Sequence, residues 1–185
     1  MDGPLKNLLV VDLTRVLVGP YCTMILSDLG ARVIKVEAPE IGDDSRKFGP
    51  FVKDYSAYFM SLNRGKESIA LNLKKPEDKK IFESIVSKAD ILVENFKPGT
   101  LEKWGLGWKE LSKKYPKLIY ASASGFGQTG PLKELPAYDM VVQGYGWTNE
   151  CYWATQFRAN KSGNFYWRYY RRIIYNNWNQ CSIVR

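Results

Sequence analysis

The segment with the clearest chemical potential follows an apolar run at residues 91–94. Residues 94–97 (Glu-Asn-Phe-Lys) place a carboxylate, an amide, an aromatic ring and a cation side by side. An amide, an aromatic face and a cation are the groups that bind an adenine ring and its phosphates. Phe96 could equally fill the hydrophobic core. The segment therefore predicts a nucleotide-like ligand and leaves the role of the ring open.

Two further loops gather charged residues. Asp43, Asp44 and Arg46 could supply metal ligands or acid–base carboxylates, but such a cluster more often forms a solvated turn or a local pair with arginine, and we favour that interpretation. Segment 63–66 (Asn-Arg-Gly-Lys) combines two cations with a turn glycine. That combination suits a phosphate and suits a plain basic turn equally well.

Composition excludes several kinds of catalytic site. The 185 residues contain no histidine, so the chain alone cannot build a Ser-His-Asp triad, a Cys-His dyad or a His-liganded zinc site. Cys22, Cys151 and Cys181 are odd in number and lack C-x-x-C spacing, which argues against disulfides and thiolate metal sites. No stretch approaches the roughly 18 apolar residues that span a bilayer. We expect no metal site, no membrane partner and a soluble, cytoplasmic protein.

A glycine-rich segment at 125–130 (Gly-Phe-Gly-Gln-Thr-Gly) matches G-x-G-x-x-G, the pattern of dinucleotide-binding loops. Such a loop must open a helix that holds the pyrophosphate, yet Pro131 and Pro136 bracket only four residues here. We therefore expect a flexible glycine loop that lets backbone approach a ligand, and no nicotinamide or flavin site.

Apolar runs alternate with helical patterns through the first 146 residues. This alternation favours an α/β fold: a Rossmann-like, mostly parallel sheet flanked by helices. Ligands of such sheets collect beyond the carboxyl ends of the strands, which here are residues 14–20, 37–46, 95–99 and 125–130. The runs predict strands at 8–13, 32–37, 67–73, 91–94 and 118–124, and helices at 21–29, 76–89, 100–104 and 108–114.

The composition changes after Gly146. Residues 147–185 contain no Leu, Pro or Asp but eleven aromatic residues, and six Lys and Arg against one Glu, which accounts for five of the eight net charges. Interleaved Arg and aromatic residues can bind nucleic acid, but their irregular spacing makes this partner the weaker hypothesis. A shifted reading frame is the stronger one, because every Trp codon then becomes a glycine codon. We expect a domain at 1–146 and an aberrant, poorly structured tail at 147–185.

Seven motifs of the first 146 residues lie at 13–20, 30–37, 42–46, 63–69, 93–99, 122–131 and 138–139. In order and spacing they resemble the motifs of the family III CoA-transferases (CaiB/BaiF). This family includes formyl-CoA transferase, carnitine CoA-transferase and α-methylacyl-CoA racemase. C-terminal to the part that this chain resembles, members of the family carry a Ser-Ile-x-Asp segment. The shifted frame can restore this segment over residues 164–170 as Thr-Ser-Ile-Gly-Asp-Ile-Ile.

The resemblance implies a Rossmann-like CoA-binding domain within an interlocked homodimer. It implies transfer of CoA from an acyl-CoA donor to a carboxylic acid acceptor, with acyl-CoA as a substrate and no permanently bound cofactor. The family's nucleophile is the Asp of Ser-Ile-x-Asp, which attacks the thioester to form an acyl-aspartyl intermediate. The corresponding position here is Arg168. We therefore expect no catalytic residue in the chain as written, and an inactive, poorly folding fragment.

The resemblance also implies a CoA site. Residues 16–18 would line the path of the pantetheine arm, 71–74 and 95–97 the adenine end, Lys103 would meet a phosphate and Tyr138 would lie near the thioester. Leu17 stands where formyl-CoA transferase has Gln, which disfavours oxalate-type chemistry, and Ala38 where some members have Arg. Tyr138 stands where racemases have His, which favours a transferase over the alternative, a racemase-type fragment. The implied contacts are Val16, Leu17, Val18, Leu71, Asn72, Leu73, Lys74, Asn95, Phe96, Lys97, Lys103 and Tyr138.

Overall fold

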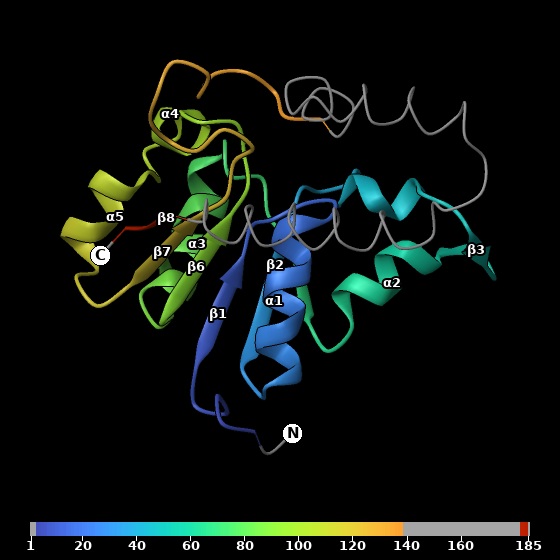
Figure 1. Cartoon of the computed structure of the whole chain (residues 1–185). Coiled ribbons are helices and arrows are strands. Elements are labelled where there is room, and N and C mark those ends of the chain that lie inside the picture. The colour runs from blue at the N-terminus through green and yellow to red at the C-terminus, as the bar shows by residue number, and fades with distance from the viewer. Residues whose placement is uncertain (1–2, 139–181, 185) are drawn as a thin grey trace. The chain divides into compact units, whose positions relative to one another are not determined.

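The computed structural model describes residues 3–138 and 182–184. Its centre is a sheet with the strand order β5-β2-β1-β6-β7-β8 (Figure 1). The pairs among the first five strands are all parallel, as the alternating sequence pattern predicts. The strands are β1 (Leu9–Asp12), β2 (Arg32–Glu37), β5 (Glu67–Ala70), β6 (Ile91–Glu94), β7 (Ile119–Ser122) and β8 (Ser182–Val184).

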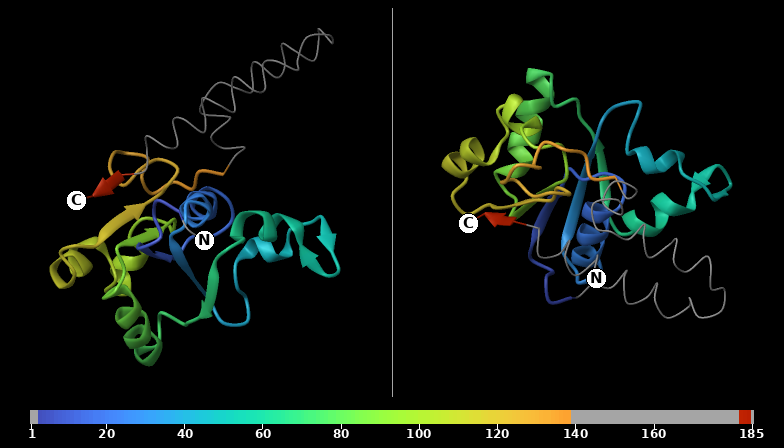
Figure 2. Two further views of the ribbon diagram at one scale, coloured as in Figure 1. Left: turned by 90° about the horizontal axis from the view of Figure 1, so that it is seen from below. Right: turned by 45° about the horizontal axis from the view of Figure 1, so that its top comes forward.

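Helices cover both faces of this sheet, which is why its central strands β1 and β6 begin with unbroken apolar runs, Leu-Val-Val and Ile-Leu-Val, rather than alternating. Val11 of β1 packs in a cluster with Phe82 and Val86, whereas its neighbour Val10 packs in a second cluster with Leu26 on the other face. Helices α3 to α5 therefore lie on one side and α1 on the other (Figure 2). The bounds are α1 (Val18–Asp28), α3 (Pro76–Val86), α4 (Thr100–Lys103) and α5 (Trp108–Lys114).

The winding of the chain reverses at β1. From β1 the sheet grows to β2 and β5 on one side, then resumes with β6 and β7 on the other. Sheets of this kind bind ligands in the crevice beyond the carboxyl ends of the two strands at the reversal. Here those strands are β1 and β6, so the loops that follow Asp12 and Glu94 form the candidate site.

Some predicted boundaries were wrong. Helix α1 begins at Val18, three residues before the predicted start, because Pro20 falls in the first turn, where its missing N–H needs no partner. The predicted strand at 67–73 ends at Ala70. A segment between β2 and β5 was not predicted to have regular structure but contains η1 (Asp44–Lys47), β3 (Phe51–Val52), β4 (Tyr55–Ser56) and α2 (Ala57–Asn63).

The chain divides into two units, Met1–Ala123 with Ile183–Arg185, and Ser124–Ser182. The five parallel strands and their helices belong to the first unit. The expected division at residue 146, most of the expected tail and Arg168 lie outside the described residues. Within the described part of the chain, no helix has the length and apolar character needed to cross a membrane.

Candidate functional site

Asn95 joins the two loops at the reversal point of the sheet. Its side chain follows β6, and its Oδ1 accepts a hydrogen bond from the Arg15 backbone N–H at 2.8 Å. Its Nδ2 donates to the Arg15 carbonyl at 2.8 Å. A single amide thus satisfies both backbone groups of Arg15, which a carboxylate or a hydroxyl could not do in this geometry. The loop after β1 is therefore held against the loop after β6.

Asp12, the last residue of β1, is fully buried beneath the same loop. It accepts hydrogen bonds from the Thr14 N–H at 2.8 Å and from the Thr23 hydroxyl at 2.6 Å. It also pairs with the buried Lys66 ammonium at 3.0 Å. Burial lowers the pKa of Lys66, and the charge of Asp12 opposes that effect. The pair fixes the end of β1 to α1 and to the loop after α2.

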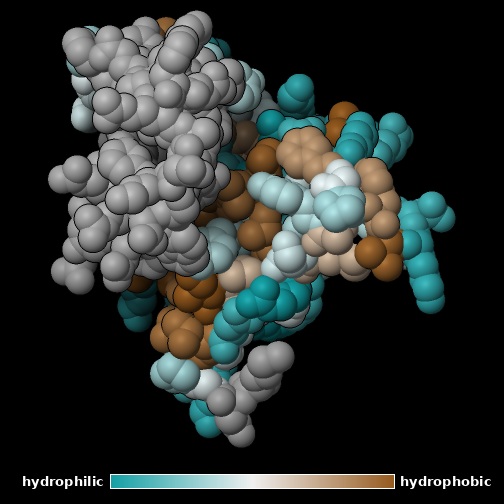
Figure 3. Space-filling model, turned by 45° about the vertical axis from the view of Figure 1, so that its right-hand side comes forward, coloured by the Kyte–Doolittle hydropathy of each residue, from teal (hydrophilic) through white to brown (hydrophobic). Residues whose placement is uncertain are grey.

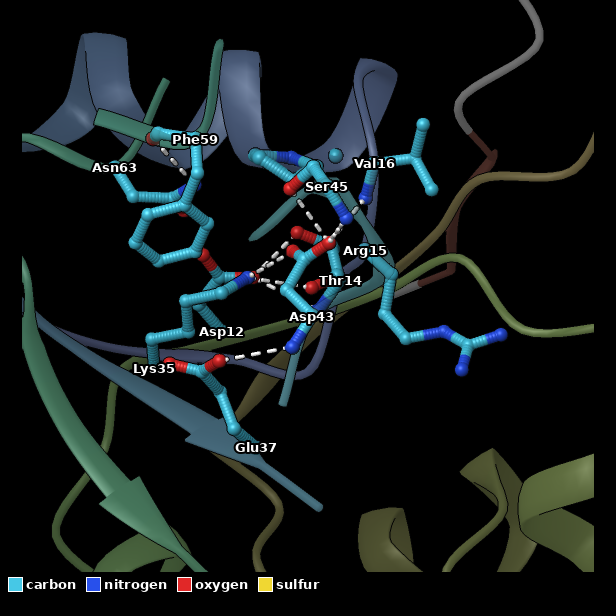
Figure 4. Close-up of polar contacts among 12 residues, drawn as sticks. Asp12, Thr14, Arg15, Val16, Lys35, Glu37, Asp43, Ser45, Phe59 and Asn63 are labelled. Atoms are coloured by element: carbon cyan, nitrogen blue, oxygen red, sulfur yellow. Dashed lines mark hydrogen bonds and ion pairs between the residues drawn. The ribbon is translucent and has the colours of Figure 1, made fainter. Parts of the chain in front are cut away.

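A second buried ion pair lies one strand away. Lys35 of β2 is the register partner of Asp12, and its Nζ lies 3.0 Å from Asp43 Oδ2 with both side chains at most 1% exposed. The other carboxylate oxygen of Asp43 accepts from the Ser45 N–H at 2.9 Å and from the Val16 N–H at 3.1 Å (Figure 4). Burial alone would raise the pKa of Asp43, but the charge of Lys35 and the bonds from Ser45 hold it below its usual value.

Glu37 closes this cluster at the end of β2. It accepts two hydrogen bonds from the Arg46 guanidinium, at 2.8 and 2.7 Å, and one from the Ser68 hydroxyl at 2.7 Å. Burial would raise the pKa of Glu37, but these donors keep it lowered. The Arg46 guanidinium also lies 3.8 Å from the centre of the Phe59 ring, so the loop after β2 is tied to α2.

The surface of the site combines a cation with aromatic rings. Figure 4 shows the Arg15 side chain pointing away from the buried cluster, and its guanidinium lies 5.7 Å from the centre of the Phe96 ring. Phe96 in turn packs edge-on to Trp104, the residue that follows α4, with 5.7 Å between the ring centres. Leu17 and Val18, at the start of α1, are each 48% exposed. The loops thus offer an aromatic and cationic region next to an apolar one.

Glu94 is a second strand-end carboxylate, on the face opposite Asp12. It is 6% exposed and accepts hydrogen bonds from the Ser122 hydroxyl of β7 and from the Phe96 N–H, the latter at 2.8 Å. Burial raises the pKa of Glu94 to about 7, although both hydrogen bonds oppose the shift. This is a carboxyl group whose charge changes near neutral pH.

The residues predicted to contact CoA fall into three groups. Val16, Asn95 and Phe96 lie at the reversal point described above, and Leu17 and Val18 follow Val16 at the start of α1. Leu71 and Leu73 are 5% and 7% exposed and belong to the hydrophobic core, so only their neighbours Asn72 and Lys74 reach the surface. Lys97 and Lys103 are exposed after β6 and in α4, and Tyr138 lies in the second unit with 73% of its surface exposed.

Two interpretations of charged loops were wrong. The favoured solvated turn at 43–46 contains Asp43, which is 1% exposed and paired with Lys35. Arg46 pairs with Glu37 rather than with a carboxylate of its own loop. Lys66 was assigned to a phosphate-binding or plain basic turn, but it is buried against Asp12. No group of three or more metal-binding side chains occurs among residues 3–138 and 182–184.

Sequence reasoning missed the buried network itself. Its signal was present: Asp12 follows the apolar run Leu-Val-Val directly, and Lys35 stands between Ile34 and Val36. Charged residues are almost never fully buried unless paired, so two opposite charges inside neighbouring strands indicate buried partners. The pattern does not reveal which partners, because Asp43 and Lys66 come from loops.

Comparison with known proteins decides the family. The sequence model of the protein family "CoA-transferase family III" matches residues 5–151, well over half of the chain. The chain belongs to CoA-transferase family III. It is 60% identical over 141 residues, or 76% of its length, to an acetyl-CoA:oxalate CoA-transferase of Acetobacter aceti. It is 49% identical over 140 residues, or 75% of its length, to the human succinyl-CoA:glutarate CoA-transferase.

A solved structure agrees with this family III assignment. The chain is similar to a CaiB/BaiF family protein from Brucella suis, with a TM-score of 0.74 and 46% sequence identity over 79% of this chain and 40% of that one. The matches cover only 36% of the length of the A. aceti protein and 32% of the human one. The chain therefore spans about a third of the length of the curated relatives that it matches.

Proposed function

We propose that residues 1–146 form the CoA-binding domain of an enzyme that transfers CoA from an acyl-CoA donor to a dicarboxylic acid acceptor. The observation that carries this proposal is the Asn95 bridge between the loops after β1 and β6. It holds together the two loops at the reversal point of an α/β sheet, which is where such sheets bind ligands. Membership of CoA-transferase family III supplies the ligand, and the names of the relatives, which include oxalate and glutarate, supply the class of acceptor.

In this proposal each part of CoA meets a suitable surface. The apolar Leu17 and Val18 border the pantetheine arm, and the Phe96 ring with the Arg15 guanidinium borders the adenine. Lys97 and Lys103, both exposed, neutralise phosphates. Leu71 and Leu73 do not contact CoA in this proposal; they pack in the hydrophobic core and so fix the positions of Asn72 and Lys74.

The acceptor expectation drawn from Leu17 needs revision. Leu17 disfavoured oxalate, yet a relative at 60% identity is named for oxalate. We therefore include oxalate among the dicarboxylates to be tested.

The chemical step needs a nucleophile that this chain does not supply. In the proposed mechanism an aspartate carboxylate attacks the thioester carbonyl, the C–S bond breaks, and the CoA thiolate leaves as an acyl-aspartyl anhydride forms. The position proposed for that aspartate is Arg168 here, outside the described residues. In this proposal the chain as written binds CoA but does not catalyse its transfer. The enzyme from which it derives acts as an interlocked homodimer in the cytoplasm.

Calorimetric titration of the 185-residue chain with CoA tests the binding site. We expect Lys103→Gln to weaken CoA binding about tenfold, because one charge-assisted phosphate contact is lost. The matched control is Lys88→Gln, an exposed lysine just after α3, next to the amino end of β6 and so at the opposite edge of the sheet; its affinity should equal that of the wild type. Equal affinities for all three proteins would contradict the proposed site.

An activity assay tests the mechanism separately. With acetyl-CoA and oxalate, the chain as written should form no oxalyl-CoA, whereas the protein read in the restored frame should. Turnover by the chain as written would contradict the assignment of the missing nucleophile.

A further inference from the structure

The backbone of residues 14–16 is held by side chains rather than by other backbone. The Thr14 N–H donates to Asp12 at 2.8 Å, and its carbonyl accepts from Lys35 Nζ at 2.7 Å. Both backbone groups of Arg15 bond to Asn95. The Val16 N–H donates to Asp43 Oδ1 at 3.1 Å. Four side chains thus fix five consecutive polar groups of the loop that borders the proposed CoA site.

This fixation holds a strained residue. Val16 has a φ of 70°, in the left-handed region that a β-branched residue seldom adopts. The steric penalty favours a negative φ by about tenfold in the absence of other forces. The conformation of the loop therefore depends on the groups that hold it, and Asp43 is the group that holds Val16.

Lys35 connects both ends of the strained segment. Its Nζ donates to the Thr14 carbonyl and pairs with the Asp43 carboxylate that receives Val16. Lys35 and Asp43 are at most 1% exposed, so neither reaches a ligand in the crevice. We propose that the Lys35–Asp43 ion pair is a positioning device that keeps residues 14–16 in the conformation that binds CoA. This inference rests on the proposed CoA site.

The first test compares affinity with stability. A loop that occupies its binding conformation only part of the time binds with an affinity reduced by that fraction. We expect Lys35→Met, in the 185-residue chain, to weaken CoA binding about tenfold and to speed hydrogen exchange at the Val16 amide. The control is Val86→Ala, a fully buried change in α3 on the other face of the sheet. It should lower stability and leave CoA affinity unchanged.

A second variant is needed because Lys35→Met leaves the buried Asp43 carboxylate without its partner, which can unfold the chain. The double variant Lys35→Met/Asp43→Asn removes both charges and keeps an oxygen for the Val16 N–H. It still lacks the bond to the Thr14 carbonyl, so CoA binding should remain about tenfold weaker than in the wild type.

A double-mutant cycle tests the strain directly. Glycine adopts a positive φ without penalty, so Val16→Gly removes the need for the clamp. In the Val16→Gly background, Lys35→Met should weaken CoA binding by about threefold at most, against about tenfold in the wild type. Equal losses in the two backgrounds, or an affinity loss no larger than that of Val86→Ala, would overturn the positioning role.

The two proposals fail in different ways. If the wild-type chain does not bind CoA, the proposed function is wrong. The positioning role is then judged by hydrogen exchange alone, and an unchanged Val16 amide in Lys35→Met would overturn it as well. If the wild type binds CoA and Lys35→Met binds equally well, only the positioning role is overturned.

Discussion

At the scale of single residues, Glu94 should make stability depend on pH near neutrality. Its pKa is raised by burial to about 7 in the folded chain, so the folded state binds the proton more tightly than the unfolded state. The proton on Glu94 therefore stabilises the folded state, and this stabilisation is lost as the pH rises through about 7. Between pH 5.5 and 8 the free energy of unfolding should fall by about 2 kcal/mol. Urea unfolding at both pH values measures this.

Glu94→Gln is the matched variant. Its amide oxygen can accept from the Phe96 N–H and its NH₂ can donate to the Ser122 hydroxyl, so the fold is kept and the titration removed. The chain contains no histidine, so no such side chain obscures the same pH window. We expect a flat stability profile for this variant. A variant that keeps the slope of the wild type would assign the effect to another group.

The sequence predicted part of the site and missed the rest for a physical reason. Asn95 and Phe96 were identified because an amide, a ring and a cation stand together at a strand end. Lys35 and Asp43 were not paired, because their contact depends on how a loop folds back over the sheet. Local residue types predict which ligand a surface suits, whereas a buried pair is fixed only by tertiary packing.

At the scale of elements, the close approach of α1 to the end of β1 depends on Gly19. A Cβ there would lie 2.3 Å from both Cβ and Cγ2 of Thr14, which is itself buried. Helix propensity alone predicts that Gly19→Ala stabilises α1. The clash predicts the opposite, a loss of about 1–3 kcal/mol. Thermal unfolding distinguishes the two predictions. A higher melting temperature for Gly19→Ala than for the wild type would show that α1 can move away from Thr14 without a loss of stability.

The elements that could be predicted are those whose own sequence fixes them. Pro76 and an acidic first turn mark the start of α3, and the structure begins that helix at the same residue. The short α2 escaped prediction because it spans only Ala57–Asn63 and starts from a local cap, in which the Ser56 hydroxyl accepts from the Phe59 N–H. A hydroxyl before a seven-residue segment is too common in loops to indicate a helix.

At the scale of the whole molecule, net charge and apolar surface oppose each other. The chain carries a net charge of +8, so copies repel one another at low salt. At physiological ionic strength this repulsion is screened over distances greater than about 8 Å. Figure 3 looks onto the side that carries β3 and α2, where apolar side chains gather among polar ones. They include Phe51, Val52, Tyr55 and Met60, which are 55%, 56%, 67% and 43% exposed.

This apolar surface should make the chain self-associate as salt is added. Val52 and Tyr55 are cross-strand partners of the β3–β4 hairpin, so Val52→Lys with Tyr55→Glu replaces an apolar pair by an ion pair and leaves the net charge at +8. Sedimentation velocity from low to high salt should then show growing assemblies for the wild type and a constant species for the double variant. CoA affinity should be the same for both, since the Val52 and Tyr55 side chains are more than half exposed and belong to neither of the loops after β1 and β6. Assembly that grows equally in both proteins would place the association on another surface.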